Sequence, residues 1–243
     1  MPTLPVIKLL TSSGLGSRRV MAEAINNGRV AINGKVVESY TKPVDLQKDV
    51  VTLDNNRVAF QTERKIYIML NKPRGVVSTT IGDRGEKTVL DVIPPKYHQS
   101  RLYPVGRLDK ESTGLILLTN DGELTYNLTH PRFEHEKEYY IHAECTLTKE
   151  EKRRLEQGIE LEEGKTSPAK VKILNLPPYN YSITIHEGKK RQVRRMFVAL
   201  GYRVLELTRV RIGSLQLGDL SPGSARELTP AELRALKSQA LKK

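Results

Sequence analysis

The sequence predicts an α+β protein of two unequal domains, a small one over residues 1–60 and a larger one over residues 61–243. Helix signals and a hairpin signal fill residues 4–53, and a polar stretch over residues 54–65 separates them from the remainder. In that remainder, alternating and apolar stretches typical of strands are mixed with short helix signals. A chain of 243 residues is long enough for both domains.

The small domain begins with apolar residues at helical spacing over residues 6–10. Ser17 can cap a second helix over residues 18–27. The residues of that helix expected to face inward are Val20, Ala24 and Ile25. Asn33-Gly34 favours a type I′ turn, because both positions of that turn need a positive φ. The pattern is therefore two helices followed by a hairpin.

Four cationic residues lie on or beside the second helix and the turn, namely Arg18, Arg19, Arg29 and Lys35. Together with residues 14–19, 28–30 and 33–34, this arrangement resembles an S4 domain, a small RNA-binding fold. The resemblance implies that the four cations contact RNA. The alternative is a helical cap with a few surface arginines.

The larger domain holds several further elements. Strands are expected over residues 66–71, 115–118, 136–143 and 181–185. Helices are expected over residues 89–92, 123–129, 148–158 and 190–200, and a last one opens at Thr229-Pro230. The apolar run over residues 115–118 has no polar alternation, which predicts a strand buried on both faces.

Arg107 and Asp109 lie on the turn that leads into the strand over residues 115–118. A charge at such a place is costly unless it is paired, so it usually has a partner or a task. Asp is also an ordinary turn residue, because its carboxylate can accept a nearby backbone hydrogen bond. The alternative is a nucleophilic or basic carboxylate that an arginine holds ionised.

The string Gly106-Arg-Leu-Asp109, followed by Ser112-Thr-Gly114 and Leu-Ile-Leu-Leu-Thr-Asn-Asp-Gly122, resembles the active-site motif of pseudouridine synthases. Within that superfamily it resembles the RsuA/RluB branch, which acts on ribosomal RNA. Lys72-Pro73-x-Gly75 is similar to the family's first motif, which buttresses the catalytic loop, and residues 187–196 are similar to its third motif.

The resemblance implies three catalytic residues. Asp109 would be the carboxylate that acts on the uridine, as nucleophile or as base. Tyr139, in Lys137-x-Tyr139, would stack on the target base, although a core tyrosine is the alternative. Arg194 would pair with Asp109 and hold it ionised. The reaction needs no cofactor and no metal, and the target uridine must leave its stack. The implied catalytic fold is a mixed, mainly antiparallel sheet with flanking helices.

The net charge of +12 and the pI of about 9.7 favour a polyanionic partner. Half of the excess charge falls within residues 186–211, where eight cations face only two glutamates. This cluster points to phosphate contact. The residues expected to bind RNA here are Lys189, Lys190, Arg191 and Arg195, together with Arg107.

Several other classes receive no support. The sequence has no run of 18 apolar residues and no export leader, so we expect a cytoplasmic protein away from membranes, and a monomer. One cysteine, Cys145, forms neither an internal disulfide nor a zinc site by itself, and its position in an expected strand favours a packed core thiol.

The expected partner is ribosomal RNA or a ribosome assembly intermediate. Residues 103–109 and 136–139 look closer to the large-subunit subgroup, which favours 23S over 16S ribosomal RNA. A non-enzymatic RNA-binding or ribosome-assembly protein would keep the basic residues without needing Asp109, Tyr139 and Arg194 together. A carboxylate glycosidase would need a second acid roughly 5–10 Å away, and no convincing one is found.

Overall fold

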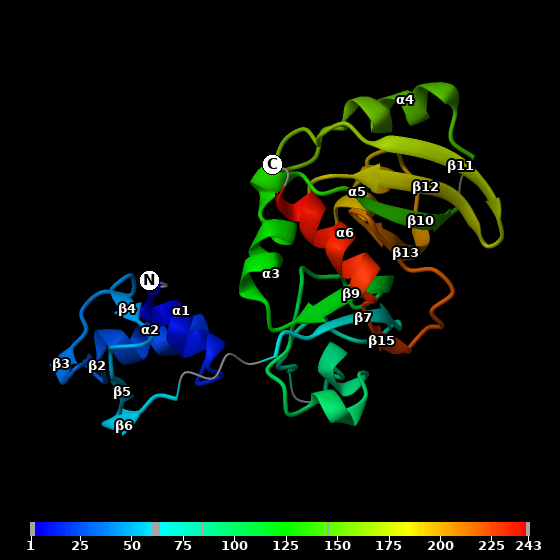
Figure 1. The fold of residues 1–243 in the computed structure, drawn as a ribbon. Coiled ribbons are helices and arrows are strands. Elements are labelled where there is room, and N and C mark those ends of the chain that lie inside the picture. Colours follow the sequence, from blue (N-terminus) through cyan, green and yellow to red (C-terminus); the bar gives the residue numbers. More distant parts are fainter. Residues whose placement is uncertain (1–2, 60–63, 84, 145, 242–243) are drawn as a thin grey trace. The chain divides into compact units, whose positions relative to one another are not determined.

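The computed structural model describes residues 3–59, 64–83, 85–144 and 146–241. The chain forms two compact units, Met1–Arg64 and Lys65–Lys243, whose elements are labelled in Figure 1. The boundary expected between residues 60 and 61 lies outside the described residues. Each unit has its own hydrophobic core.

The N-terminal unit packs two helices against short strands. The helices are α1 (Val6–Ser12) and α2 (Arg18–Asn26), and the strands are β1 (Thr3–Pro5), β2 (Val30–Ile32), β3 (Lys35–Val36), β4 (Pro43–Asp45), β5 (Val51–Leu53) and β6 (Asn56–Arg57). One sheet has the order β3-β2-β5-β6, and β1 pairs with β4; all these pairs are antiparallel.

Local signals account for this unit well. Ser17 accepts a hydrogen bond from the Val20 N–H at 3.0 Å and so caps α2. Asn33 and Gly34 have φ values of +51° and +79°, as a type I′ turn requires. The expectation that Val20 faces inward is wrong, because Val20 is 50% exposed while Met21 is buried. The buried stripe of α2 is Met21, Ala24 and Ile25, which have the i, i+3, i+4 spacing.

The second unit is built on one mixed sheet, in the order β11-β12-β10-β13-β9-β7-β15, with β14 on β13 and β8 on β9. The strands are β7 (Tyr67–Lys72), β8 (Tyr103–Pro104), β9 (Thr113–Thr119), β10 (Lys137–Ala143), β11 (Lys170–Leu176), β12 (Tyr179–Ile185), β13 (Val204–Ile212), β14 (Leu215–Gln216) and β15 (Ala225–Glu227). Only the β13–β9 pair is parallel among the strands described. The mixed, mainly antiparallel sheet expected from the sequence is thus confirmed.

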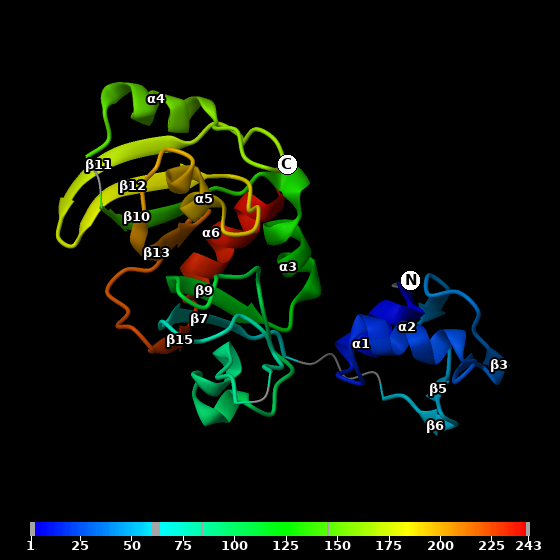
Figure 2. The same ribbon diagram turned by 180° about the vertical axis from the view of Figure 1, so that it is seen from behind.

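Helices cover both faces of this sheet (Figures 1 and 2). They are α3 (Gly122–Thr129), α4 (Lys149–Gln157), α5 (Gln192–Val198) and α6 (Pro230–Leu241), with 3₁₀ turns η1 (Val89–Asp91), η2 (Pro95–Tyr97) and η3 (Pro131–Phe133). Apolar residues of α3 and α6 pack in one hydrophobic cluster, and those of α4 and α5 pack in the other.

Strand β9 joins the two clusters. Ile116 and Leu118 belong to one cluster, and Leu115 and Leu117 to the other. All four side chains are at most 1% exposed. The expectation of a strand buried on both faces is confirmed, because successive side chains of a strand point to opposite faces. The segment that follows the Asp109 turn is therefore fixed from two sides.

Two helical segments differ from their expected extents. Helix α5 begins at Gln192 and not at residue 190. Arg191 has a left-handed φ of +51°, which a right-handed α-helix cannot include. The segment at residues 89–92 is a 3₁₀ turn capped by Thr88 and Asp91. The capping boxes at Thr148/Glu151 and Thr229/Glu232 both form.

Within the described ranges, none of the helices has the length and apolar character needed to cross a bilayer. The same ranges contain no cluster of three or more His, Cys, Asp or Glu residues suited to a metal ion. Cys145 lies outside the described residues.

Candidate active site

A single row of residues crosses four neighbouring strands of the large sheet. Tyr139 on β10 is the register partner of Arg209 on β13, and Arg209 is in turn the partner of Gly114 on β9. Gly114 also pairs with Lys72 on β7. The sheet therefore brings together residues from four distant parts of the sequence, and the turn that carries Asp109 leads into this row.

Gly114 makes the parallel contact between β9 and β13 sterically feasible. Its φ is +99°, and a Cβ built on it would lie 2.3 Å from the backbone oxygen of Arg209. Next to it, the hydroxyl groups of Thr113 and Thr208 are 2.7 Å apart and hydrogen-bonded. A glycine is required here because a side chain at this φ is strained and has no room.

The turn that carries Asp109 is held by hydrogen bonds on both sides of the aspartate. Before it, the Ser78 hydroxyl donates to the Leu108 carbonyl at 2.9 Å and accepts from the Leu108 N–H at 3.1 Å. After it, the Gly75 N–H donates to the Lys110 carbonyl at 2.9 Å. Within the turn, the Ser112 N–H donates to the Asp109 carbonyl at 3.0 Å. These bonds fix the backbone from which the carboxylate projects.

Lys72 is the main internal support of this turn. Its side chain has no exposed surface, and its Nζ donates to the carbonyls of Val76 at 2.7 Å, Pro73 at 3.0 Å and Lys110 at 3.3 Å. Burial lowers the pKa of Lys72 to about 8, against the opposing charges of Glu111 and Asp109. The Lys72-Pro73-x-Gly75 string thus contacts the Asp109 turn through both Lys72 and Gly75.

Asp109 lies in a cleft of about 1060 Å³. The carboxylate-bearing residue is partly buried, and Tyr139, Arg209 and Lys137 line the same cleft. Tyr139 is 9% exposed and also belongs to the hydrophobic core. Burial lowers the pKa of Lys137 to about 8, and the nearby charge of Arg209 lowers it further. The cleft therefore combines one aromatic wall with several cations around a carboxylate.

Arg209 is a site residue that the sequence analysis assigned to a surface cluster. It is 2% exposed, and its Nε donates to the Leu115 carbonyl at 2.8 Å. Its Nη1 lies 3.5 Å from the Arg107 carbonyl, and its buried Nη2 has no hydrogen-bond partner in the described part of the chain. The sequence feature that could have identified Arg209 is its spacing of two residues from the apolar Leu207. Alternate residues of a strand lie on the same face, and both residues of β13 line the cleft.

Arg194 does not form the expected salt bridge with Asp109. Among the described residues, no ion pair within 4 Å joins the two, and the Arg194 Nη1 donates instead to the Val204 carbonyl at 2.8 Å. Burial lowers the pKa of Arg194, as does the charge of Arg191, whereas the charge of Asp109 opposes this. The two groups therefore interact through their charges without direct contact.

Comparison with known proteins identifies the family. Residues 66–199, more than half of the chain, match the family described as RNA pseudouridylate synthase, and residues 4–51 match the S4 domain. The chain belongs to the RNA pseudouridylate synthase family. The resemblance to an S4 domain and to a pseudouridine synthase that the sequence motifs indicated is confirmed. As a pseudouridine synthase, the protein is an isomerase.

Similar proteins span nearly the whole synthase. A Bacillus subtilis (strain 168) protein named ribosomal large subunit pseudouridine synthase B is 43% identical, over 96% of this chain and 95% of that protein. An uncharacterized RNA pseudouridine synthase of Aquifex aeolicus (strain VF5) is 41% identical, over 94% and 92% respectively. A crystal structure of a pseudouridylate synthase superposes with a TM-score of 0.68 at 33% identity, over 96% of this chain and 99% of that chain.

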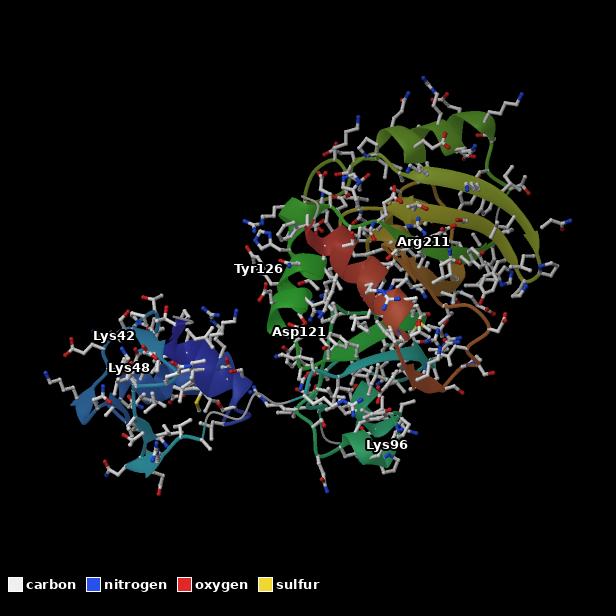
Figure 3. The ribbon with its side chains drawn as sticks, viewed as in Figure 1. Lys42, Lys48, Lys96, Asp121, Tyr126 and Arg211 are labelled. Carbon is white, nitrogen blue, oxygen red and sulfur yellow. The ribbon has the colours of Figure 1, made fainter. Side chains whose placement is uncertain are left out.

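The structure divides the basic cluster of residues 186–211 that the sequence suggested. Arg209 is buried, and Arg211, labelled in Figure 3, forms ion pairs with Glu136 at 3.2 Å and Glu138 at 3.0 Å. Arg209 is too deeply buried to belong to a phosphate-binding surface, whereas phosphate contact by Arg211 stays a prediction. Arg195 forms an ion pair with Glu163 and lines neither of the cavities described for the synthase.

The remaining expected RNA-binding residues fall into two groups. Arg107, Lys189, Lys190 and Arg191 line the Asp109 cleft, although the Lys189 Nζ also donates to the carbonyls of Gly164 and Lys165. Arg18, Arg19, Arg29 and Lys35 are exposed in the N-terminal unit, where Arg29 pairs with Asp54 at 2.5 Å. RNA contact by either group, and by Arg195, stays a prediction.

Proposed function

We propose that this synthase converts specific uridines of ribosomal RNA to pseudouridine, with 23S ribosomal RNA as its substrate, either free or in a ribosome assembly intermediate. The name of the Bacillus subtilis relative supports the large subunit. The net charge of +12 and the exposed cations of the S4 domain support a polyanionic substrate. The pseudouridine synthase family supplies the reaction.

The observation that carries the mechanism is that Asp109, Tyr139 and Arg209 line one cleft. Two other carboxylates line this cleft, but both have other roles. Glu187 accepts hydrogen bonds from the Ser167 N–H and the Gln192 side chain, and Glu134 lies 4.0 Å from His186. Asp109 is therefore the carboxylate that we assign to the uridine, as nucleophile or base.

Several cations lie near this carboxylate. Lys72 and Arg194 both interact with the Asp109 charge, and Arg209 lines the same cleft. An ionised carboxylate is the form that can attack the sugar or the ring, whereas a protonated one cannot. Arg194 lines the neighbouring cavity and not this cleft, so it acts here only through its charge. Arg209 is a buried arginine that lines the cleft itself.

The target uridine reaches Asp109 only after it leaves the RNA stack. Unstacking costs a few kcal/mol. The ring of Tyr139 offers a stacking surface, which typically contributes about 1–3 kcal/mol per base. Phosphate contacts by Arg107, Lys190 and Arg191 at the cleft supply the remaining free energy needed to unstack the uridine. This arrangement supports capture of one extruded nucleotide.

The test is the Asp109→Asn variant, which keeps the shape of the side chain and removes its charge. We expect single-turnover release of tritium from [5-³H]uridine-labelled ribosomal RNA to fall at least about 10³-fold, because the reacting group is lost. RNA binding should change little. Asp219→Asn, on an exposed loop outside the cleft, is the matched control. Product formation by Asp109→Asn at the wild-type rate would remove the assignment.

The ribosomal subunit is tested separately. Pseudouridines are mapped in the ribosomal RNA of a strain that lacks the gene. The proposal expects a missing pseudouridine in 23S ribosomal RNA that returns when the wild-type gene is restored and does not return with Asp109→Asn. A missing modification confined to 16S ribosomal RNA would assign the small subunit instead.

A further inference from the structure

A second cavity lies next to the Asp109 cleft in the same unit. It has a volume of about 500 Å³, within the range of sites that hold small organic groups. Its charged lining includes four arginines, Arg74, Arg191, Arg194 and Arg203. Arg191 lines both this cavity and the Asp109 cleft, so the two sites share one wall residue.

The cavity carries a net positive charge. Its four guanidinium groups face two carboxylates, Glu111 and Glu206. Glu111 is already paired with Arg74, whose Nε lies 2.7 Å from the Glu111 Oε2. Arg191 and Arg203 are exposed and take part in none of the ion pairs found in the described residues. Two exposed cations without an ion-pair partner in the described residues therefore remain at the cavity, which favours an anionic occupant.

Buried polar atoms at the cavity also lack partners. In the described part of the chain, neither the Nε nor the Nη2 of Arg194 has a hydrogen-bond acceptor, and the Nδ1 of His142 is likewise unpartnered. Buried polar atoms are nearly always hydrogen-bonded. The charge of Arg191 also disfavours the Arg194 cation, so an anion between them would stabilise both. The wall of the cavity therefore contains a guanidinium whose hydrogen-bonding capacity is only partly used.

We propose that this cavity binds the phosphodiester of the RNA nucleotide adjacent to the one held in the Asp109 cleft, an inference that rests on the proposed function. A phosphodiester offers the acceptor oxygens that the arginines lack. Because Arg191 borders both cavities, a strand with one nucleotide in the cleft and its neighbour in the second cavity would pass Arg191. Val198, Val204 and Leu205 form an apolar wall suited to the attached nucleoside.

The experiment uses the full-length protein and a fluorescently labelled short oligouridylate, with binding followed by anisotropy at several KCl concentrations. Arg203→Gln removes one exposed cation of the cavity. Each phosphate contact contributes about 0.7 to the slope of log K against log salt for a single strand. We expect this variant to lower the magnitude of the slope by about 0.7 and to weaken binding about threefold at low salt. Arg203→Lys should restore most of the slope.

Arg154→Gln is the matched control, because Arg154 is exposed on α4 and lines neither cavity. It should leave the slope unchanged. An Arg203→Gln slope equal to that of wild type, or to that of the control, would overturn the proposal. That result would leave the assignment of Asp109 untouched, since product formation is not measured. Conversely, an active Asp109→Asn variant would not alter a reduced Arg203→Gln slope.

A free nucleotide offers the same phosphate chemistry and is tested in a second arm. Uridine monophosphate is titrated into wild type and Arg203→Gln by calorimetry. Binding of uridine monophosphate to wild type that is lost in Arg203→Gln, with no change in the oligouridylate slope, would assign the cavity to a free nucleotide and overturn the strand proposal. A reduced oligouridylate slope supports the strand.

Discussion

The two units of the molecule differ in whether they bury any of their site cations. In the N-terminal unit Arg18, Arg19 and Lys35 are exposed on short elements around a small core. The second unit also has exposed cations, but Lys72 and Arg209 are buried on strands of its large sheet, and backbone carbonyls hold both. Exposed charges are screened by salt, whereas buried charges act strongly over short distances.

This difference assigns different tasks to the same kind of charge. Exposed cations can attract a polyanion and exchange partners as it moves, so their effects should be small, additive and dependent on salt. Buried cations cannot rearrange around a moving ligand, but they can hold the Asp109 carboxylate and its turn in place. Their effects should be large and should appear in product formation as well as in folding. Substitutions at Lys72 and Arg18 test this contrast, and substitutions at Tyr139 should have an effect between the two.

Lys72→Met should have the largest effect. It removes the donor that Val76, Pro73 and Lys110 share, and buried carbonyls without a partner are costly. We expect the free energy of unfolding in urea to fall by about 2–4 kcal/mol. Single-turnover product formation should fall at least about tenfold at a temperature where the variant is folded, because the Asp109 turn loses its support.

The matched control is Lys172→Met on the exposed edge strand β11, which should change neither quantity appreciably. If Lys72→Met unfolded at the same urea concentration as wild type and kept full activity, buried cations would not be the structural basis of the site. The contrast between the two units would then fail.

Tyr139 should show an intermediate effect that depends on its ring. Tyr139→Ala should weaken binding of substrate ribosomal RNA by roughly 5- to 150-fold, the equivalent of about 1–3 kcal/mol of stacking. Tyr139→Phe keeps the ring and should bind nearly as well as wild type. Filter binding at fixed salt measures both. Equal losses in the two variants would exclude stacking as the role of this side chain.

Arg18→Gln should have the smallest effect. Because Arg18 is exposed on α2, its loss should weaken RNA binding about threefold at low salt and lower the magnitude of the salt slope by about 0.7–0.9. Arg18→Lys should behave like wild type. Because Arg18 is expected to affect binding alone, product formation at saturating RNA should equal that of wild type. A loss comparable with that of Lys72→Met would contradict the division of tasks between the units.

Local features of the sequence were sufficient to predict many elements of the fold. The Ser17 cap, the Asn33-Gly34 turn and the Thr148/Glu151 capping box each depend on residues a few positions apart. The doubly buried strand over residues 115–118 needed only its apolar run. In the site, the motif around Asp109 and the spacing of Tyr139 located two residues of the same cleft.

Features that depend on strand register were not predictable in the same way. Arg209 was counted as a surface cation because its sequence neighbours are basic, but its pairing with Tyr139 and Gly114 turns it inward. The Arg194 bond to Val204 likewise depends on how α5 packs against β13. The alternation of Arg209 with Leu207 indicates that the two share a strand face, but the partners of Arg209 and Arg194 lie far apart in the chain, and local spacing does not identify them.

The close approach at Gly114 has a consequence for how this protein can vary. The bare α-carbon there lets the strand after the Asp109 turn approach the Arg209 strand closely, and even one added methyl group would collide with the Arg209 main chain. A substitution at this position would displace both segments at once. Position 114 should therefore accept no other amino acid, however freely the solvent-facing cations are exchanged.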